Sequence, residues 1–566
     1  MHGENSYMTF EPLKSNFEPE QAKALAPYCT STTQSIFALK NLPEVVKGAL
    51  FSRYSRSYLG LRELLLRDFI QDDQSCFSEI ALSKADNTQT ASADTSVQLQ
   101  SEAIEKAQSF YDRILDGYGD DSIGELGGAH LALENISMLA AKAIQNKRIG
   151  GSPLEKSTRY IYFDRKIEGK YPYLREAQLM KLDAKLYESC CDQLFETYKN
   201  LSEPLTAHIR KNFPQEEGTP EGAYNAALRA KVLDCLRGLL PASTLTNMGL
   251  FGNGRFFEGL LASLAGDELN ELTEVAKCAR QELAKVIPSF VRRSFPGNRH
   301  FLMQKDYQDE LSTLVNTHLA GNTHSTQLSK TTQTPIEPSV RLVEQNPQAV
   351  NKILASLLYD MGNLSYEESW NRAENMSKSK RNALFTQMAA VRRNRRHKSP
   401  RALEHAFFHF EIEADFGVWR DLQRHRMLTQ QHQLLNCDLG FTISSEIADA
   451  GLLEPYCNAL EIAKNAHAKF VAMGAGKSAQ YIVPMAFRMR WKVHLNLRAL
   501  QWLCELRSAP AGHTHYRLIA QEMAHQLCDA EPSLAPFFKF VDMEGHSLGR
   551  MQQEKRRVSK ESHAAS

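Results

Sequence analysis

The pattern of hydrophobic and polar positions predicts a chain built mainly of amphipathic helices. Apolar residues recur at spacings of three and four, the period of a helix with one buried face. The predicted helices span residues 102–115, 131–147, 182–208, 223–239, 269–286 and 453–471. Strand signals are fewer: residues 407–413 (FFHFEIE) alternate in polarity, and residues 158–163 (TRYIYF) are rich in β-formers. This mixture predicts an α+β fold with small antiparallel sheets packed against long helices.

Two polar stretches, residues 84–101 and 321–339, are rich in Ser and Thr and are typical of linkers or surface loops. The second lies beyond the midpoint of the chain. It predicts a boundary between an N-terminal domain (1–320) and a C-terminal domain (340–550), followed by a charged tail (551–566).

The chain also carries weak internal similarity. Sliding it by 277 positions places Ala129 on Ala406 without a gap, and sliding it by 243 places Pro241 on Pro484. The second offset also matches Asn253 with Asn496, Arg255 with Arg498 and Leu260 with Leu503. Because the two blocks occur in the same order with matched surroundings, we predict that the halves arose by duplication.

Composition adds mainly exclusions. The 566 residues contain 67 Lys and Arg against 66 Asp and Glu, so the overall charge gives no argument for nucleic-acid or anionic-membrane binding. No apolar run is long enough for a bilayer, and the N-terminal residues do not resemble a signal peptide. The ten cysteines are scattered without a CxxC pair, which predicts reduced thiols in a cytoplasmic protein.

The strongest local signal for chemistry is Arg424-His425-Arg426. Two arginines that flank a histidine can hold a phosphate or pyrophosphate, although this triplet alone favours a solvated basic helix end. The basic run at 392–398 has two readings as well, a solvated loop or a loop that faces phosphate. His405 and His409 have the spacing of metal ligands on a helix, but the alternating run around them predicts a strand and therefore no metal site.

The wider context resembles the flavin-dependent thymidylate synthases. Ser399-Pro400, Glu404-His405 and the Arg-His-Arg triplet match one stretch of that family, while Asn496-Leu497-Arg498 and Arg507 match a second. The resemblance implies that the triplet contacts FAD and that Arg507 belongs to the nucleotide substrate. A flavin-contacting histidine of the family falls on His513 or on His515.

The two halves depart from the family in opposite ways. Where the family has Glu, Ser and Arg after the triplet, the C-terminal half has His432, Leu434 and Asn436. The N-terminal half keeps these residues as Glu155, Ser157 and Arg159 but has Lys147-Arg148-Ile149 in place of the triplet. Likewise Arg237 matches a family arginine that contacts the nucleotide phosphate and its counterpart is Gln480, whereas the counterpart of Arg507 is Leu264.

This complementarity suggests one composite site made from both halves. We expect Glu155, Ser157, Arg159 and Arg237 to grip the nucleotide together with Arg507, with Ser157 and Arg507 acting in catalysis. We expect Ser399, Arg424, His425, Arg426, Asn496, Arg498 and His513 to bind FAD.

The resemblance further implies an enzyme that converts dUMP to dTMP with FAD, NADPH and methylenetetrahydrofolate, and a homo-oligomer formed by a dimer of tandem chains. Two alternatives stay open. One is flavin-dependent methylation of another pyrimidine nucleotide or of an RNA uridine. The other is a non-catalytic descendant that binds flavin or nucleotide.

Overall fold

The computed structural model describes residues 16–54, 57–70, 124–319 and 337–564. The predicted helix at 102–115, the stretch at 84–101 and most of the predicted linker at 321–339 lie outside these residues. The chain forms two compact units, of which the first comprises Met1–Leu133, Ile149–Leu154 and Gly249–Thr323 and the second comprises the remainder. The division into domains 1–320 and 340–550 stays a prediction.

The first unit is mainly helical. Its helices are α1 (Pro19–Leu25), α2 (Glu44–Tyr54), α3 (Leu61–Leu65), α9 (Gly254–Ala265), α10 (Asn270–Leu283), α11 (Pro288–Val291) and α12 (Arg299–Leu319), with a π-helical turn η1 (Leu66–Ile70) and a 3-10 turn η4 (Arg292–Ser294). Helix α9 packs against α10 and α11 and buries Phe257 and Leu261 completely. Its apolar face therefore forms the centre of this part of the core.

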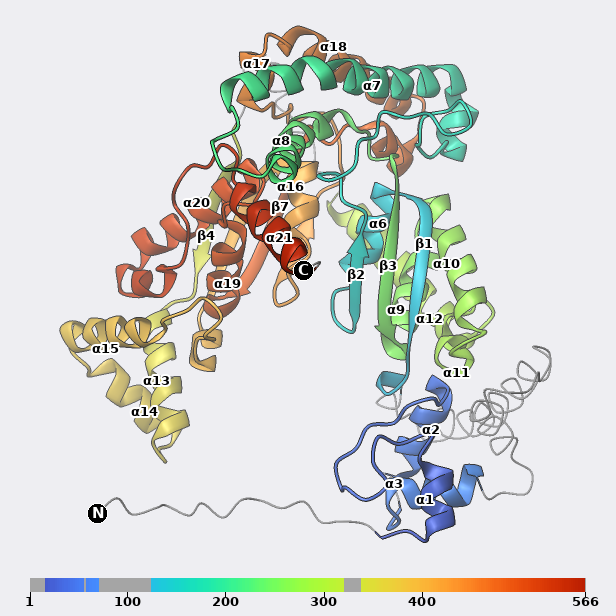
Figure 1. Cartoon of the computed structure of the whole chain (residues 1–566), viewed down its shortest axis with the longest axis vertical. Coiled ribbons are helices and arrows are strands. Elements are labelled where there is room, and N and C mark those ends of the chain that lie inside the picture. Colours follow the sequence, from blue (N-terminus) through green and yellow to red (C-terminus); the bar gives the residue numbers. More distant parts are fainter. Residues whose placement is uncertain (1–15, 55–56, 71–123, 320–336, 565–566) are drawn as a thin grey trace. The chain divides into compact units, whose positions relative to one another are not determined.

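The second unit contains most of the described helices. They are α6 (Met138–Asn146), α7 (Ala177–Asn212), α8 (Glu221–Leu236), α13 (Ala349–Met361), α14 (Tyr366–Glu374), α15 (Lys378–Val391), α16 (Phe416–Leu422), α17 (Ser445–Asp449), α18 (Leu453–Ala472), α19 (Leu497–Arg507), α20 (Thr514–Ala530) and α21 (Met551–Ala564), with 3-10 segments η3 (Arg237–Leu239), η6 (Arg401–His405), η7 (Gly476–Ile482) and η8 (Pro532–Phe538). Helices α7 and α18 pack along each other (Figure 1). The rings of Tyr187 and Phe470 meet edge to face between them.

Two small sheets complete the α+β fold, as the sequence predicts. Strands β1 (Gly128–Ser137), β2 (Gly151–Glu155) and β3 (Leu245–Asn253) have the order β1-β3-β2. Strands β4 (Ser339–Gln345), β5 (Phe407–Asp415), β6 (Thr429–His432) and β7 (Arg488–Asn496) form an antiparallel sheet of order β4-β5-β7-β6. Apart from β4, the two orders are the same, since β1, β3 and β2 correspond to β5, β7 and β6.

Most predicted elements are confirmed, and two are wrong. Residues 131–147 are not one helix, because β1 continues to Ser137, whose side chain caps α6 by accepting from the Ala140 backbone (2.9 Å). Residues 158–163 are not a strand. The hydroxyl of Ser157 accepts from the Arg159 backbone (3.2 Å) and starts a turn that leaves Tyr160 half exposed. In both places a local capping side chain overrides the average propensity of the stretch.

A pseudo-twofold axis relates the two halves at the point where their matching segments meet. Pro241 forms an antiparallel bridge with Pro484, the residue 243 positions later. The flanking hydrogen bonds, each 2.9 Å long, occur in symmetric pairs: Ala242 N to Val483 O with Met485 N to Leu240 O, and Ser243 N to Tyr481 O with Ala486 N to Gly238 O. Within each pair of bonds, the two donor residues are 243 positions apart and so are the two acceptor residues. This symmetry confirms the duplication and the offset of the second block.

The constant offset of 277 in the first block is wrong. The bond from Gly254 N to Gly127 O has its symmetric counterpart in Leu497 N to Ala406 O, so that Ala406 corresponds to Gly127 and not to Ala129. Strand β1 has ten residues and β5 has nine. The additional residue is taken up near Asn135, which has a φ of 56° and donates its N–H to the side chain of Asn247. Such a bulge changes the register by one position. The offset is 278 at the triplet, because the bonds from Lys147 N to Ile144 O and from His425 N to Leu422 O are symmetric. The predicted match of the triplet with Lys147-Arg148-Ile149 is therefore wrong by one position, and its counterpart is Asn146-Lys147-Arg148. The offset returns to 277 at Lys156 and Gln433, where the bonds to Asn247 O and Arg490 O are symmetric, so Glu155 does correspond to His432.

Candidate active site

A cavity of about 640 Å³ in the second unit collects nearly all residues that the family resemblance assigns to FAD. Its walls come from the basic run at 392–398, the Arg-His-Arg triplet and the start of α19. Ser399, Arg424, His425, Arg426, Asn496 and Arg498 all line it. Its lining residues include eight arginines and lysines but a single carboxylate, that of Glu404. The cavity is therefore suited to an anionic ligand.

The basic run is fixed in place and is not a freely solvated loop. Arg392 forms a two-pronged ion pair with the fully buried carboxylate of Glu505, and Arg395 donates to the Glu505 carbonyl oxygen (3.1 Å). Ser399 donates to the side chain of Gln501 (2.6 Å). Because Glu505 and Gln501 both belong to α19, this helix holds the opposite wall of the cavity at a defined distance.

The histidine of the triplet is neutral and serves as an acceptor. His425 Nε2 accepts a hydrogen bond from Arg507 Nε (3.0 Å). Burial, together with the positive charges of Arg507 and Arg424, lowers the pKa of His425 to about 3. His425 can therefore orient Arg507 at neutral pH without adding charge to an already basic site.

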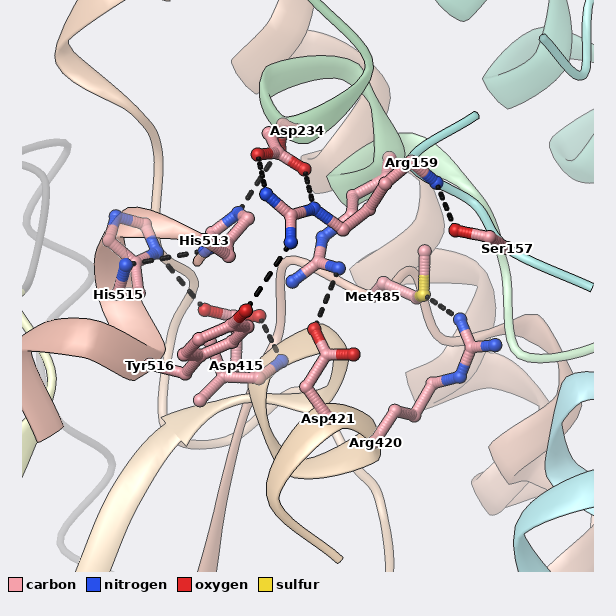
Figure 2. A network of polar contacts seen from close by, with 12 residues as sticks. Ser157, Arg159, Asp234, Asp415, Arg420, Asp421, Met485, His513, His515 and Tyr516 are labelled. Atoms are coloured by element: carbon pink, nitrogen blue, oxygen red, sulfur yellow. Dashed lines mark hydrogen bonds and ion pairs between the residues drawn. The ribbon is translucent and has the colours of Figure 1, made fainter. Parts of the chain in front are cut away.

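Arg159 lies in a second cluster that adjoins Arg507 through one tyrosine. Its guanidinium forms a two-pronged ion pair with Asp234 (2.6 and 2.7 Å), and its Nη1 donates to the Tyr516 hydroxyl (3.3 Å), as Figure 2 shows. The guanidinium carbons of Arg159 and Arg507 lie 5.9 and 5.4 Å from the centre of the Tyr516 ring. One arginine from each half of the chain therefore contacts the same side chain.

Arg237 joins the two halves a second time. It extends from η3, is almost fully buried, and donates from Nη1 to Asp421 Oδ2 (3.0 Å), while Arg424 Nη2 donates to Asp421 Oδ1 (3.0 Å). Its other terminal nitrogen, Nη2, is buried without a hydrogen-bond partner. A Cβ at Gly417 would lie 3.4 Å from this guanidinium, so the glycine leaves room for it.

The carboxylate between these arginines is fully ionised. Burial alone would raise the pKa of Asp421, but Arg237, and after it Arg424, Arg159 and Arg507, hold that pKa far below its usual range. Four of the six arginines assigned to nucleotide or flavin from the sequence therefore act on one carboxylate, Asp421, which was not among the predicted site residues.

The two histidines after α19 lie with the Arg159 cluster. His513 is buried, caps α20, and places Nε2 3.4 Å from the Asp234 carbonyl oxygen, while His515 Nδ1 lies 3.3 Å from Asp415 Oδ2. Burial, followed by the charge of Arg237, keeps the pKa of His513 well below its usual value. Neither histidine is among the residues that line the cavity. The assignment of His513 to FAD stays a prediction.

The structure brings Ser157 to the cluster but not Glu155. The Glu155 side chain is 5% exposed and is bound by Lys142 (2.8 Å), Arg420 and Gln145 (2.9 Å) in a separate network near the pseudo-twofold axis. Burial opposes ionisation there, yet Arg420 and Lys142 lower the pKa of Glu155 to about 2. Both carboxylate oxygens are used within the protein, so a contact of Glu155 with substrate stays a prediction.

Sequence reasoning missed Asp234, Asp415, Asp421 and Tyr516. Asp421 gives the best local signal, because it stands three residues before Arg424, the spacing of a helical ion pair. Asp234 and Tyr516 have no such signal, since their partner Arg159 is 75 and 357 residues away. Among the described residues, no group of three or more His, Cys, Asp or Glu is arranged to hold a metal ion. No described helix is both long and apolar enough to cross a membrane.

Comparison with known proteins agrees with the geometry. Residues 67–289 and 341–533 match the family model described as thymidylate synthase complementing protein. The chain belongs to this family. The two matched segments fall in the two halves of the chain, in agreement with the internal duplication.

Several relatives share this length. A UPF0159 protein of Chlamydia muridarum is 44% identical over 543 residues, covering 96% of this chain and 98% of the relative. A UPF0159 protein of Chlamydia pneumoniae is 44% identical over 542 residues, covering 96% and 98%. One from Thermoplasma acidophilum is 31% identical over 476 residues, covering 80% of this chain and 92% of the relative.

Among solved structures, the chain matches the crystal structure of a UMP/dUMP methylase PolB from Streptomyces cacaoi bound with 5-Br dUMP. The match has 15% identity and a TM-score of 0.29, and it covers 37% of this chain and 99% of the other. At this TM-score the likeness carries no argument about the site.

Proposed function

We propose that this chain is a flavin-dependent thymidylate synthase that converts dUMP to dTMP, with methylenetetrahydrofolate as carbon donor, reduced FAD as hydride donor and NADPH as reductant. The observation that supports this most is the meeting of the two incomplete halves. Arg159 and Arg237 come from the first half and Arg424 and Arg507 from the second. Arg237 and Arg424 share the carboxylate of Asp421, and Arg159 and Arg507 share the side chain of Tyr516.

Arg159, Arg237 and Arg507, which we call the arginine cluster, suit a nucleotide phosphate. A dianion needs several donors with fixed directions, and guanidinium groups supply them in pairs. Arg237 Nη2 has no hydrogen-bond partner although it is buried. An unsatisfied buried donor costs about 1–3 kcal/mol, and a ligand oxygen that accepts from it would recover this free energy.

The neighbouring cavity suits FAD. Its cations match the charge of a diphosphate, and Trp502 keeps 45% of its surface exposed at the wall, which offers a face for ring stacking. Arg424, Arg426 and Arg498 would hold the diphosphate. When bound, reduced FAD would supply a hydride.

The chain itself would contribute positioning and charge. Arg159, Arg237 and Arg507 would bind the phosphate, with His425 keeping Arg507 oriented. A cysteine nucleophile is not needed for this proposal. Burial raises the pKa of Cys437 and of Cys504 well above the usual value, so both thiols stay protonated and are poor nucleophiles.

The direct test is to incubate the purified protein with FAD, NADPH, methylenetetrahydrofolate and dUMP and to measure dTMP by mass spectrometry. We expect dTMP only when all components are present. Arg159→Ala and Arg424→Ala should each abolish it, whereas Arg229→Ala, which removes an exposed arginine of α8, should not. Arg159 and Arg424 of one chain both lower the pKa of Asp421, which supports a site within one chain, so mixing the two inactive variants should not restore activity.

Other outcomes redirect the proposal. Restored activity in the mixture would place the pairing between chains. FAD retention without dTMP would favour another pyrimidine nucleotide or an RNA uridine as substrate. A protein that retains no FAD and forms no dTMP would favour the non-catalytic alternative.

A further inference from the structure

Each arginine assigned to the nucleotide phosphate from the first half already holds a carboxylate of the chain. Asp234 binds Arg159 with both oxygens, which fixes the plane of that guanidinium. Asp421 differs, because it gives one oxygen to Arg237 and the other to Arg424. A carboxylate that bridges two cations with separate oxygens occupies them in the manner of a bound phosphate.

The position of Asp421 in its helix is unfavourable in the absence of these arginines. It is the penultimate residue of α16, where the partial negative charge of the helix terminus opposes a carboxylate. Its side chain is 14% exposed, so solvent compensates for only part of the charge. Arg237 and Arg424 therefore stabilise a carboxylate that local structure disfavours.

The symmetric half gives an independent observation. The start of α6 corresponds to that of α16 with an offset of 278, because the bonds of Met138 and Phe416 to Thr244 and Phe487 are symmetric. In this register Ala143 stands for Asp421 and Asn146 for Arg424, while Gln480 stands for Arg237. Where the arginines are missing, the carboxylate is missing too, which indicates that Asp421 belongs functionally to the arginines.

We propose that Asp421 is a built-in counter-ion that occupies the phosphate position between Arg237 and Arg424 in the free protein, so that a nucleotide phosphate binds only by displacing it. The inference rests on the proposed function, because it takes Arg237 as part of the nucleotide phosphate site. Arg424, which is assigned to the FAD diphosphate, is the second cation that Asp421 neutralises. Asp421 then keeps the affinity for phosphate compounds in general low. Contacts to base and sugar decide which of them bind.

The test compares Asp421→Asn with wild type by calorimetric titration of the protein with inorganic phosphate, dUMP and deoxyuridine. Removing one negative charge beside the bound anion should tighten phosphate and dUMP by about tenfold or more, and leave deoxyuridine unchanged. Asp529→Asn removes an exposed carboxylate of α20 and should match wild type with all three ligands. Equal or weaker binding of phosphate by Asp421→Asn would overturn the proposal, because a merely structural Asp421 predicts weaker binding.

Asp421→Ala provides a second route if Asp421→Asn folds poorly. Added phosphate should raise its Tm more than that of wild type, because the anion replaces the missing carboxylate. If the variants fold only with phosphate the proposal is supported, and failure to fold even then overturns it.

The inorganic phosphate arm needs neither nucleotide nor flavin. Tighter phosphate without dTMP formation by wild type would keep this inference and reject the proposed reaction. The reverse result would keep the reaction and reject the inference.

Discussion

The arginine cluster and its counterpart across the pseudo-twofold axis began as the same structure and now differ in charge. On one side Arg237 presents a buried donor without a partner. On the other, Gln480 is satisfied by the chain itself, because it accepts from Leu435 N (3.0 Å) and donates to Lys477 O (3.1 Å). The first side therefore keeps a buried donor that a ligand could satisfy, whereas the polar groups of Gln480 are satisfied within the protein.

A duplicated chain can lose half of the predicted site residues from each copy and still hold one of each, because the two halves lose different ones. The residues of the two halves meet because the halves pair at Pro241 and Pro484. This pairing places η3 of the first half next to α16 of the second, where Arg237 binds Asp421. On the side that has Gln480 in place of Arg237, other residues can be substituted during evolution, provided that their buried polar groups form hydrogen bonds within the protein.

The largest expected effect concerns Glu155, whose counterpart is His432. Glu155→Ala leaves Lys142 and Arg420 buried without their carboxylate, and we expect a loss of about 3–5 kcal/mol in stability. His432→Ala removes an exposed side chain that contacts Trp419 and should cost no more than about 1 kcal/mol. Thermal unfolding of both variants measures the difference. Similar Tm values would mean that Glu155 is not the structural centre of this network.

The next largest expected effect distinguishes Arg237 from its counterpart Gln480. Arg237→Ala should weaken dUMP binding by about a hundredfold or more, because it removes a buried charged donor from the phosphate site. Gln480→Ala should leave dUMP binding unchanged and lower only the Tm, since its partners are backbone groups. Titration with dUMP decides between them. A loss of dUMP affinity in Gln480→Ala would show that the second side still binds nucleotide.

The smallest effect concerns two symmetric helix caps. Asn253 accepts from Phe256 N and Asn496 from Ala499 N, each at 2.8 Å, so replacement of either by Ala should cost about 1 kcal/mol. Only Asn496 also lines the cavity. Asn496→Ala should therefore lose FAD on gel filtration more readily than Asn253→Ala, as measured by flavin absorbance per protein. Equal FAD retention would argue that the cavity does not bind flavin through this residue.

The α+β class and the duplication could be predicted from the sequence, because they depend on residue identity and spacing, and the complementary losses followed from the family resemblance. Periodicity located α7, α8, α10 and α18 and the strand β5. It failed at residues 131–147 and 158–163, where the capping side chains of Ser137 and Ser157 decide the local backbone.

Which charged side chains pair with each other could not be predicted from the sequence and became visible only in the folded chain. Arg237 and Asp421 are 184 residues apart, and neither lies in a pattern that names the other. Tertiary packing also directed Glu155 into the buried network near the axis while Arg159, four residues later, reached Asp234. Ion pairs over such separations depend on how the two halves pack about their axis, and local sequence carries no record of that packing.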